Sequence, residues 1–466
     1  MSVLWTSGEM EAATLGRSTQ NFAAQGISID TRTLKPGDLF VALKGENRDG
    51  HHFVSAAFDC GAAAALVSRR PDNVHDDAPL LFVANTQRAL EDLGVAARKR
   101  AGAKVVAVTG SAGKTTTKEM LRLALSALGL TRASVSSYNN HWGVPLSLAQ
   151  FPRGCRFGVF EIGMNHFGEI RGLVGFVRPH IAIITTIAPA HLEYFGSVEA
   201  IADAKSEIFE GLQPDGVAIA PAENPCTERL IARARQANVK RTLAFGQSRD
   251  ADARLVSIRD SSTGMHVEAE ICGQRHAFAI GASGMHIAHN ALATLLAVAA
   301  LGEDVATAAG ALAAFSALKG RGARLAVHLA SGAIEIIDES YNANPASMRA
   351  ALGLLAAAEP GAGGRRVAVL GDMLELGPQS TALHADLAGA VEEAKTDIVF
   401  ACGRDMRALY EALPLSRRGL WAETSSEIAP EIVRAVRAGD KVLIKGSLGS
   451  RMAVILEALK AGGGAS

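Results

Sequence analysis

A glycine-rich loop between an apolar run and a helical pattern places the strongest constraint on the fold of this chain. The run Lys104-Val105-Val106-Ala107-Val108 is typical of a buried strand, and a helix is predicted from about Thr115 to Leu128. The segment between them is Thr109, Gly110, Ser111, Ala112, Gly113, Lys114, Thr115 and Thr116. Backbone N–H groups in such a loop, together with the helix N-terminus, bind phosphate oxygens. The loop therefore predicts a nucleotide site, in which Lys114 reaches the β- and γ-phosphates and the Thr115 hydroxyl ligates Mg²⁺.

The loop departs at one position from the usual pattern GxxxxGK[ST]. The first glycine of that pattern would stand at position 108, where this chain has Val108. A glycine-rich turn with an incidental lysine is the alternative interpretation. The strand–loop–helix context favours phosphate binding.

Apolar runs alternate with helical patterns along most of the 466 residues, which predicts an α/β protein of three domains. Residues 1–101 are interpreted as a small mixed α/β domain with strands at 39–43 and 64–67. Residues 102–319 are interpreted as a central P-loop domain with a parallel sheet. Residues 320–466 are interpreted as a doubly wound, Rossmann-like domain.

The same patterns predict the individual elements. Further strands are expected at 157–162, 181–186, 217–220, 334–338, 366–371, 397–402 and 441–445. Helices are expected at 89–100, 287–301, 305–315, 347–358, 381–394 and 427–438. In the third domain, polar or glycine residues stand at the strand ends, namely Asp338, Gly371-Asp372, Gly403 and Lys445-Gly446. Because ligands bind at the carboxyl edge of open parallel sheets, this edge is predicted to hold a ligand.

The charge balance and the cysteines restrict the class of protein. Lys+Arg and Asp+Glu both total 47, whereas proteins that neutralise nucleic-acid phosphates normally carry a basic excess, so no nucleic acid is expected as a partner. Five cysteines without a CxxC motif predict free thiols in a reducing compartment. There is no signal-peptide pattern, and the apolar stretch around 288–301 is too short to span a bilayer. We expect a cytoplasmic protein without membrane insertion.

Several other positions carry residue types that suit nucleotide chemistry, each with a plainer alternative. Glu161 ends an apolar strand, where its carboxylate would suit a hard cation, and a strand-end salt bridge is the alternative. His286 and Asn290 share a helix face at i and i+4, and a helix cap is the alternative. Arg321 stands between two glycines, where a flexible linker cation is the alternative. The pair Asn139-Asn140 is by itself most often a loop or a cap.

These motifs follow one another as they do in the Mur ligases and the related folylpolyglutamate synthetases, and the chain resembles this family over essentially its whole length. The TGxxGKT[ST] loop, with Val108 in place of the first glycine, is itself similar to the family's loop. The resemblance implies ATP and two Mg²⁺ sites. It also implies that His191 and Lys205 ligate the second Mg²⁺, with Lys205 as a carbamate, although a lone loop His and a helical Lys are more often structural.

The resemblance further implies which residues contact the substrates. The implied ATP contacts beyond the loop are His286 and Asn290 at the base, Arg321 at the phosphates, and Asp338 and Tyr341 closing over the nucleotide. The implied contacts with a UDP-linked substrate are Thr31, Arg32, Asn139 and Asn140. A β-turn with a surface arginine is the alternative for Thr31 and Arg32.

One segment indicates which reaction of the family is expected. Gly371-Asp372-Met373-Leu374-Glu375-Leu376-Gly377 resembles the members that add D-alanyl-D-alanine, and the Asp-Asn-Pro-Arg motif of the diaminopimelate-adding relative is absent. The implied function is ATP-dependent ligation of this dipeptide to UDP-N-acetylmuramoyl-tripeptide through an acyl phosphate, by a monomer. The residues implied on the dipeptide side are Asn342, Asn344, Asp372 and Lys445. Another amide ligase of the family and a P-loop switch are the alternatives, and the third residue of the acceptor peptide stays open.

Overall fold

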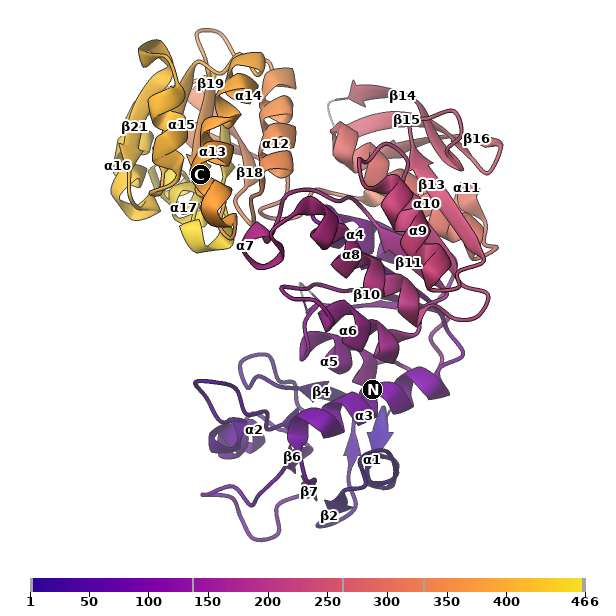
Figure 1. Ribbon diagram of the computed structural model, residues 1–466. Helices are drawn as coiled ribbons and strands as arrows, with labels where there is room; N and C mark the ends of the chain where they lie inside the picture. Colours follow the sequence, from indigo (N-terminus) through magenta and orange to yellow (C-terminus); the bar gives the residue numbers. More distant parts are fainter. Residues whose placement is uncertain (1–2, 136–137, 262–263, 330–331, 463–466) are drawn as a thin grey trace.

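Three α/β parts follow one another along the chain in the computed structural model, which describes residues 3–135, 138–261, 264–329 and 332–462. In Figure 1 the N-terminal part lies at the bottom, the central part on the right and the C-terminal part at the upper left. Each part is built on its own main sheet. The predicted α/β class with three successive sheet units is confirmed.

The N-terminal part contains a five-stranded sheet of order β2-β7-β6-β5-β4, parallel except for β2. Its strands are β2 (Arg17–Ser18), β4 (Gly26–Ser28), β5 (Asp38–Val41), β6 (Ala64–Val67) and β7 (Leu80–Phe82), beside a separate pair, β1 (Trp5–Thr6) and β3 (Ala23–Ala24). Its helices are α1 (Ser7–Thr14), α2 (Val54–Asp59) and α3 (Thr86–Arg100). Helix α3 begins earlier than predicted, because the Asn85 side chain caps it by accepting the Arg88 N–H at 2.9 Å.

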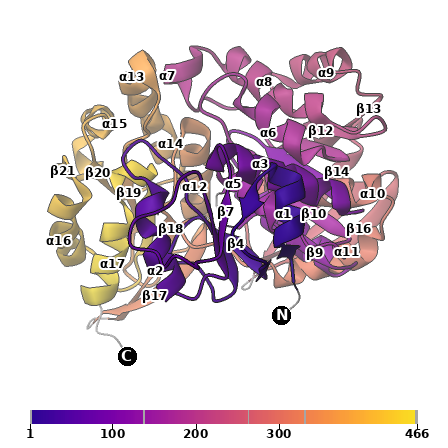
Figure 2. The ribbon, with the colours of Figure 1, turned by 90° about the horizontal axis from the view of Figure 1, so that it is seen from below.

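Helix α3 and the start of the chain dock the N-terminal part onto the central part. Helix α3 packs against both α1 and the central helix α5 (Gly143–Ala149), as Figure 2 shows from below. Trp5 is 1% exposed, and its Nε1–H donates to the Ala149 carbonyl at 2.8 Å. The Arg100 guanidinium stacks over the Trp5 ring at 3.6 Å from its centroid. The two parts therefore share one hydrophobic core.

We expect Trp5→Ala to lower the free energy of unfolding by about 3–5 kcal/mol, because it leaves a cavity at this junction and deprives the Ala149 carbonyl of its donor. Denaturant unfolding followed by circular dichroism measures the loss. Val3→Ala is the control, since Val3 is 53% exposed and should change stability by less than about 0.5 kcal/mol. Equal stability of the two variants would contradict the docking role of Trp5.

The central part contains a nine-stranded sheet of order β16-β15-β14-β13-β12-β11-β8-β10-β9. Its strands are β8 (Lys104–Thr109), β9 (Thr131–Ala133), β10 (Phe157–Glu161), β11 (Ile181–Ile184), β12 (Val217–Pro221), β13 (Arg241–Gly246), β14 (Ala253–Ser261), β15 (Gly264–Ile271) and β16 (Gln274–Ile280). The pairs from β9 to β14 are parallel, as predicted for β8, β10, β11 and β12. Strands β9 and β13 were not predicted, and neither was the antiparallel extension of β14, β15 and β16. The turn between β15 and β16 contains Cys272 and Gly273, both with positive φ, which suits a two-residue hairpin.

Helices cover both faces of the central sheet. One face carries α4 (Lys114–Ser126), α10 (Met285–Ala300) and α11 (Val305–Ala311). The other face carries α5, α6 (Glu169–Val177), α8 (Val198–Ser206) and α9 (Thr227–Gln236). Strand β8 lies in the middle, with Val106 and Val108 in one core and Val105 and Ala107 in the other. Burial on both faces explains why its sequence is an unbroken apolar run.

The C-terminal part contains a six-stranded sheet of order β17-β18-β22-β19-β20-β21, parallel except for β17. Its strands are β17 (Ala323–Leu329), β18 (Gly332–Glu339), β19 (Arg366–Gly371), β20 (Ile398–Cys402), β21 (Arg418–Ala422) and β22 (Lys441–Lys445). Its helices are α12 (Pro345–Ala357), α13 (Ser380–Ala385), α14 (Leu387–Glu393), α15 (Met406–Ala412), α16 (Ser425–Ala435) and α17 (Ala453–Gly462). The single helix predicted at 381–394 is wrong, since α13 and α14 are separate and Asp386 between them pairs with Arg349 at 2.5 Å.

The carboxyl ends of β18, β22 and β19, which were predicted to bind a ligand, lie in the middle of the C-terminal sheet. Strands β18, β22 and β19 are neighbours, with Glu339 opposite Lys445 and Lys445 opposite Leu370. Their carboxyl ends, and the loops that follow, face the central part. Across the described ranges, no helix is both long and apolar enough to cross a membrane.

Candidate functional site

A cavity of about 900 Å³ lies between the central and C-terminal parts. From the central part it is lined by the phosphate loop, the strand-end loops, α8 and the start of α10, including Ser111, Ala112, Gly113, Lys114, Thr116, Asn139, Glu161, His191, Lys205, His286, His289 and Asn290. From the linker and the C-terminal part it is lined by residues that include Gly320, Arg321, Glu339, Tyr341, Asn342, Asn344, Leu374, Glu375, Lys445 and Ser447. The fold thus gathers into one cavity most of the residues that the sequence singled out.

The phosphate loop joins the end of β8 to the start of α4 through two glycines with positive φ, Gly110 at 152° and Gly113 at 81°. The Lys114 ammonium donates to the Gly110 carbonyl at 2.7 Å. Burial lowers the pKa of Lys114, the nearby Glu161 carboxylate raises it, and the Arg321 charge lowers it further. A cation held in this way next to a second cation favours an anionic ligand in the loop.

We expect Gly110→Ala to weaken nucleotide binding by about tenfold or more, a cost of roughly 1.4 kcal/mol. A Cβ at this position would lie 1.9 Å from Thr185 Oγ1, and φ would be unfavourable for alanine. Titration calorimetry with ATP measures the effect. Gly102→Ala is the matched control, because a Cβ there meets nothing within 4 Å. An unchanged dissociation constant in Gly110→Ala would contradict this prediction, because it would show that the loop accommodates a Cβ at position 110.

Glu161 and Thr115 form an oxygen pair at the base of the loop. The Thr115 hydroxyl donates to Glu161 Oε2 at 2.9 Å, and the Asn139 amide donates to Oε1 at 2.8 Å. Glu161 is 1% exposed, and the described residues give it no ion-pair partner, which removes the salt-bridge alternative. A hydroxyl and a carboxylate oxygen beside a phosphate loop suit a hard divalent cation. Among the described residues no three His, Cys, Asp or Glu side chains converge as a site complete in itself.

His191 and Lys205 line the same cavity from the loop after β11 and from α8. His191 has φ of 59°, begins the short helix α7 (Leu192–Phe195), and contacts the Glu375 carboxylate through Nδ1. That leaves its Nε2 for another partner. Lys205 is 1% exposed, and burial together with the charge of Lys114 holds its pKa well below the ordinary range. In the part of the chain that the structure describes, its ammonium has no hydrogen bond and no carboxylate partner, which is unusual for a buried lysine.

The start of α10 brings polar side chains against the phosphate loop. Asn290 Oδ1 would lie 2.7 Å from a Cβ on Gly113, so only glycine permits this close approach. Burial lowers the pKa values of His286 and His289, which favours the neutral form of both rings. Over the described ranges, His289 Nε2 is a buried polar atom without a hydrogen-bond partner. An orphaned atom in a cavity wall indicates that a ligand or water completes it.

The linker between the two parts carries Arg321 into the cavity. Its guanidinium stacks over the Tyr341 ring at 4.2 Å from the centroid. Its charge also lowers the pKa values of Lys114 and Lys445, so cations from both parts share one space. Asp338, in contrast, is fully buried and does not line the cavity. Its carboxylate accepts the Gly320 N–H at 2.8 Å and the Ser340 hydroxyl at 2.6 Å, which fixes the linker.

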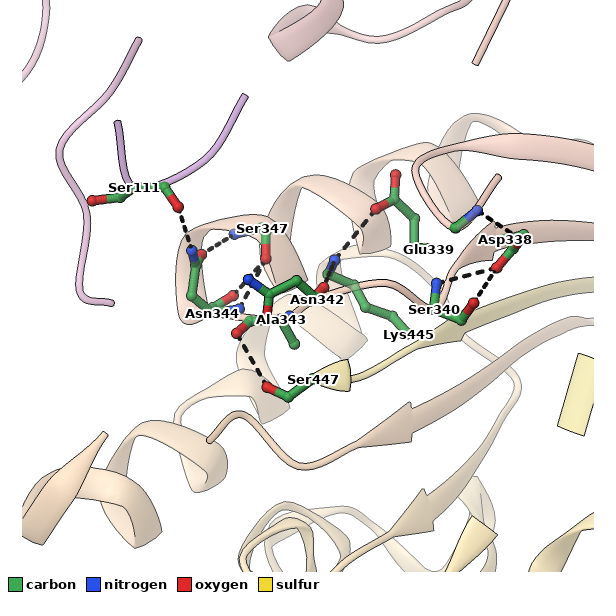
Figure 3. Close-up of polar contacts among 11 residues, drawn as sticks. Ser111, Asp338, Glu339, Ser340, Asn342, Ala343, Asn344, Ser347, Lys445 and Ser447 are labelled. Carbon is green, nitrogen blue, oxygen red and sulfur yellow. Dashed lines mark hydrogen bonds and ion pairs between the residues drawn. The ribbon is translucent and has the colours of Figure 1, made fainter. Parts of the chain in front are cut away.

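Three residues implied on the dipeptide side meet at the end of β22, and Figure 3 shows their contacts. The Lys445 ammonium donates to the Asn342 carbonyl at 2.9 Å and pairs with Glu339 at 3.3 Å. Burial lowers the pKa of Lys445, and the Glu339 carboxylate opposes that shift. Asn344 caps α12 and reaches the phosphate loop.

Of the predicted residues, Thr31, Arg32, Asn140 and Asp372 also lie outside the cavity lining, as do Asp338, Thr109, Gly110 and Thr115. Thr31 and Arg32 belong to the N-terminal part, where the Arg32 guanidinium pairs with Asp30 at 2.6 Å and is 81% exposed. Asn140 accepts the Trp142 N–H at 3.2 Å and the Gly143 N–H at 2.9 Å, which is the loop role given as its alternative. Asp372 accepts the Met406 N–H at 2.8 Å, and burial raises its pKa.

Other residues in the cavity wall were not singled out from the sequence. Glu375 lies in the recognised Gly371–Gly377 segment, and its backbone carbonyl accepts the Glu193 N–H at 3.1 Å. Glu339 and Ser447 follow the strand ends that were predicted to bind a ligand, so their proximity to Asp338 and Lys445 was the available signal. His289 lies between His286 and Asn290, and only the helix geometry shows that it joins them.

Comparison with known proteins assigns this architecture to a family. The profile of the Mur ligase middle domain matches residues 108–298, that of the Mur ligase glutamate ligase domain residues 323–448, and that of the Mur ligase family catalytic domain residues 23–123. The chain belongs to the Mur ligase family.

Three similar proteins carry the name of one member of that family. The UDP-N-acetylmuramoyl-tripeptide–D-alanyl-D-alanine ligase of Escherichia coli is 34% identical over 98% of this chain and 97% of its own length. The crystal structure of MurF from Acinetobacter baumannii superposes with a TM-score of 0.85 at 32% identity, covering 98% of this chain and 99% of that one. MurF ligase from Thermotoga maritima in complex with ADP gives a TM-score of 0.78 at 26% identity, covering 94% and 97%.

Proposed function

We propose that this chain is an ATP-dependent ligase that joins D-alanyl-D-alanine to UDP-N-acetylmuramoyl-tripeptide in peptidoglycan precursor synthesis. One observation carries the proposal. Lys114, Lys205, Arg321 and Lys445 line a single cavity together with Leu374 and Glu375 of the Gly371–Gly377 segment. Basic side chains from two sheet units, with Lys114, Arg321 and Lys445 as the cations, suit a reaction in which a polyphosphate and a carboxylate must meet. The relatives that share nearly the full length bear the name of this activity.

The phosphate loop, α10 and Arg321 are the proposed ATP site. Backbone N–H groups of the loop and Lys114 bind the β- and γ-phosphates, and Arg321 reaches them across the linker. His286, His289 and Asn290 lie on the side of α10 that faces the base and ribose. An ADP-bound relative of the same fold supports nucleotide binding here.

The oxygen and nitrogen donors of the cavity fit two proposed Mg²⁺ sites. Thr115 and Glu161 would hold the first, and His191 and a carbamylated Lys205 would hold the second. Bound Mg²⁺ offsets the negative charge of the phosphates. Burial favours the neutral amine of Lys205, which is the form that reacts with carbon dioxide, so the lowered pKa supports the carbamate.

The chemistry proceeds in two balanced steps. A carboxylate oxygen of the tripeptide attacks the γ-phosphorus, the bond to ADP breaks, and an acyl phosphate forms. The free amine of the dipeptide then attacks the acyl carbon, phosphate departs with its bonding electrons, and the amine loses a proton as the amide forms. Lys114 and Arg321 neutralise charge as two anions approach, which is the main electrostatic obstacle.

Each sheet unit has a proposed task. Residues 1–101 hold the UDP-linked substrate through Thr31 and Arg32, residues 102–319 bind ATP, and residues 320–466 present the dipeptide beside Lys445. The five cysteines are unpaired, which together with ATP as substrate supports action in the cytoplasm. We expect a monomer.

Phosphate release assayed with UDP-muramoyl-tripeptide, with and without D-alanyl-D-alanine, tests the proposal. Release that requires the dipeptide, with a product heavier by one dipeptide minus water, is the expected result. Parallel reactions offer diaminopimelate with the UDP-dipeptide acceptor, and glutamate with a folate. Release without any amine substrate would favour a nucleotide-hydrolysing switch, and turnover only in a parallel reaction would favour another ligase of the family.

A further inference from the structure

Asn344 makes the polar contact between the C-terminal part and the phosphate loop that is visible in Figure 3. Its amide Nδ2 donates to the Ser111 carbonyl at 3.4 Å, over a sequence separation of 233 residues. Asn344 is 5% exposed and Ser111 6%, so this contact is largely buried in the cavity wall. A buried side-chain amide that links two sheet units calls for a functional explanation.

The orientation of the Asn344 amide is fixed by a capping box at the start of α12. Asn344 Oδ1 accepts the Ser347 N–H at 2.8 Å, and the Ser347 hydroxyl accepts the Asn344 N–H at 2.9 Å. Because the oxygen is engaged by the helix, the NH₂ group must point the other way. It therefore faces the phosphate loop as a donor.

The segment before Asn344 is held rigidly to the C-terminal sheet. Lys445 donates to the Asn342 carbonyl at 2.9 Å, and the Ser447 hydroxyl donates to the Ala343 carbonyl at 3.5 Å. Ser447 also accepts the Leu374 N–H at 2.9 Å, which ties in the segment that carries Glu375. Any movement of Asn344 is therefore coupled to movement of β22 and of the proposed dipeptide side.

Ser111 is equally fixed on the central part. Its hydroxyl donates to the Ala188 carbonyl at 3.0 Å and accepts the Ala188 N–H at 3.0 Å, and its own N–H donates to the Thr186 carbonyl at 2.8 Å. Residues 186–188 lead directly into the loop that carries His191. Asn344 thus contacts Ser111, the residue through which the phosphate loop is hydrogen-bonded to the segment after β11.

We propose that Asn344 is a positioning residue that sets the register of the C-terminal part on the phosphate loop, rather than a contact of the dipeptide. This inference rests on the proposed function, because the register matters when an amine from one part must meet an acyl phosphate formed on the other. Displacement of reacting groups by about 1 Å lowers rates by about 100-fold. The residue acts through Ser111 and does not touch the reacting atoms.

Asn344→Ser is the decisive variant. Serine keeps a good N-cap for α12 but is too short and lacks the NH₂ donor for Ser111. We expect kcat to fall by about tenfold to 100-fold, with KM for ATP, the UDP-tripeptide and the dipeptide each within about threefold of wild type and Tm nearly unchanged. Hydrogen exchange of residues 108–116, measured without substrates, should accelerate.

Thr424→Ala provides the matched control. Thr424 caps α16 in the same C-terminal part through a capping box of the same kind and does not line the cavity. It should lower Tm while leaving kcat and the exchange of residues 108–116 unchanged, which separates the loss of a cap from the loss of the contact with Ser111.

Three outcomes would overturn the inference. A raised dipeptide KM with intact kcat would make Asn344 a substrate contact. A fall in kcat that tracks Tm equally in both variants would make it a structural cap. Wild-type exchange and kinetics in Asn344→Ser would make the Ser111 contact incidental. The exchange experiment needs no substrate, so its result stands even if wild-type enzyme shows no dipeptide-dependent phosphate release.

Discussion

Replacing Lys114 by alanine is expected to abolish turnover, with a loss of about 1000-fold or more in kcat/KM. The Lys114 ammonium lies at the start of α4, donates to Gly110 within the loop, and faces the cavity beside Glu161. Without it, the β- and γ-phosphates keep the backbone N–H groups but lose the adjacent cation of the loop. Arg321 reaches the same space from the linker and cannot replace the charge at the loop itself.

Phosphate release and ATP calorimetry measure this effect together. ATP affinity should fall with turnover, because the lysine binds the ground-state phosphates as well as the transition state. Lys104→Ala is the control, since Lys104 begins the same strand β8 but pairs with Glu303 at 2.8 Å, away from the cavity. A Lys114→Ala enzyme with wild-type kcat/KM would refute the assignment of the phosphate loop.

Replacing Lys205 by alanine is expected to reduce activity by a comparable factor, about 1000-fold, because the second proposed Mg²⁺ site loses an anionic oxygen. Short carboxylic acids should restore part of the activity by occupying the vacated space. Lys205→Arg should stay inactive, because a guanidinium keeps the cation but cannot form the carbamate. Lys240→Arg is the control, since Lys240 is 74% exposed and pairs with the exposed Asp215.

The pH dependence of the same residue follows from its lowered pKa. Only the neutral amine reacts with carbon dioxide, so wild-type activity should fall as pH drops through the folded-state pKa of Lys205, and added bicarbonate should restore it. In carbon-dioxide-free buffer the folded state disfavours the proton that the unfolded state retains, so stability rises with pH between that lowered pKa and the ordinary lysine value.

Lys205→Met should therefore be inactive yet melt at a higher temperature than wild type at neutral pH, because an unpaired buried amine is replaced by an apolar chain of similar length. Fully active Lys205→Arg, or a Lys205→Met enzyme that is less stable at neutral pH without carbon dioxide, would show that the lysine is an ordinary structural residue.

Local signals in the sequence were sufficient for the elements around the phosphate loop. Strand β8 is buried on both faces, so its sequence is an unbroken apolar run that indicates a buried strand. Gly110 and Gly113 mark the turn that follows. The same signals were weaker where the environment decides the structure. The hairpin of β15 and β16 lies at the end of the sheet, where buried residues are mixed with exposed and half-buried ones. No glycine or proline marks the break between α13 and α14.

The sequence by itself determined the α/β class, the phosphate loop and the order of the motifs, because these depend on residues a few positions apart and on the periodicity of burial. Only the tertiary structure decided which of the polar residues share a cavity. Asp338 and Asp372 carry the same carboxylate as Glu339 and Glu375, yet the first two accept backbone N–H groups while the last two line the cavity wall. That choice depends on which way each side chain leaves its strand or loop, and on partners such as Gly320 and Met406. No spacing within one segment encodes those partners.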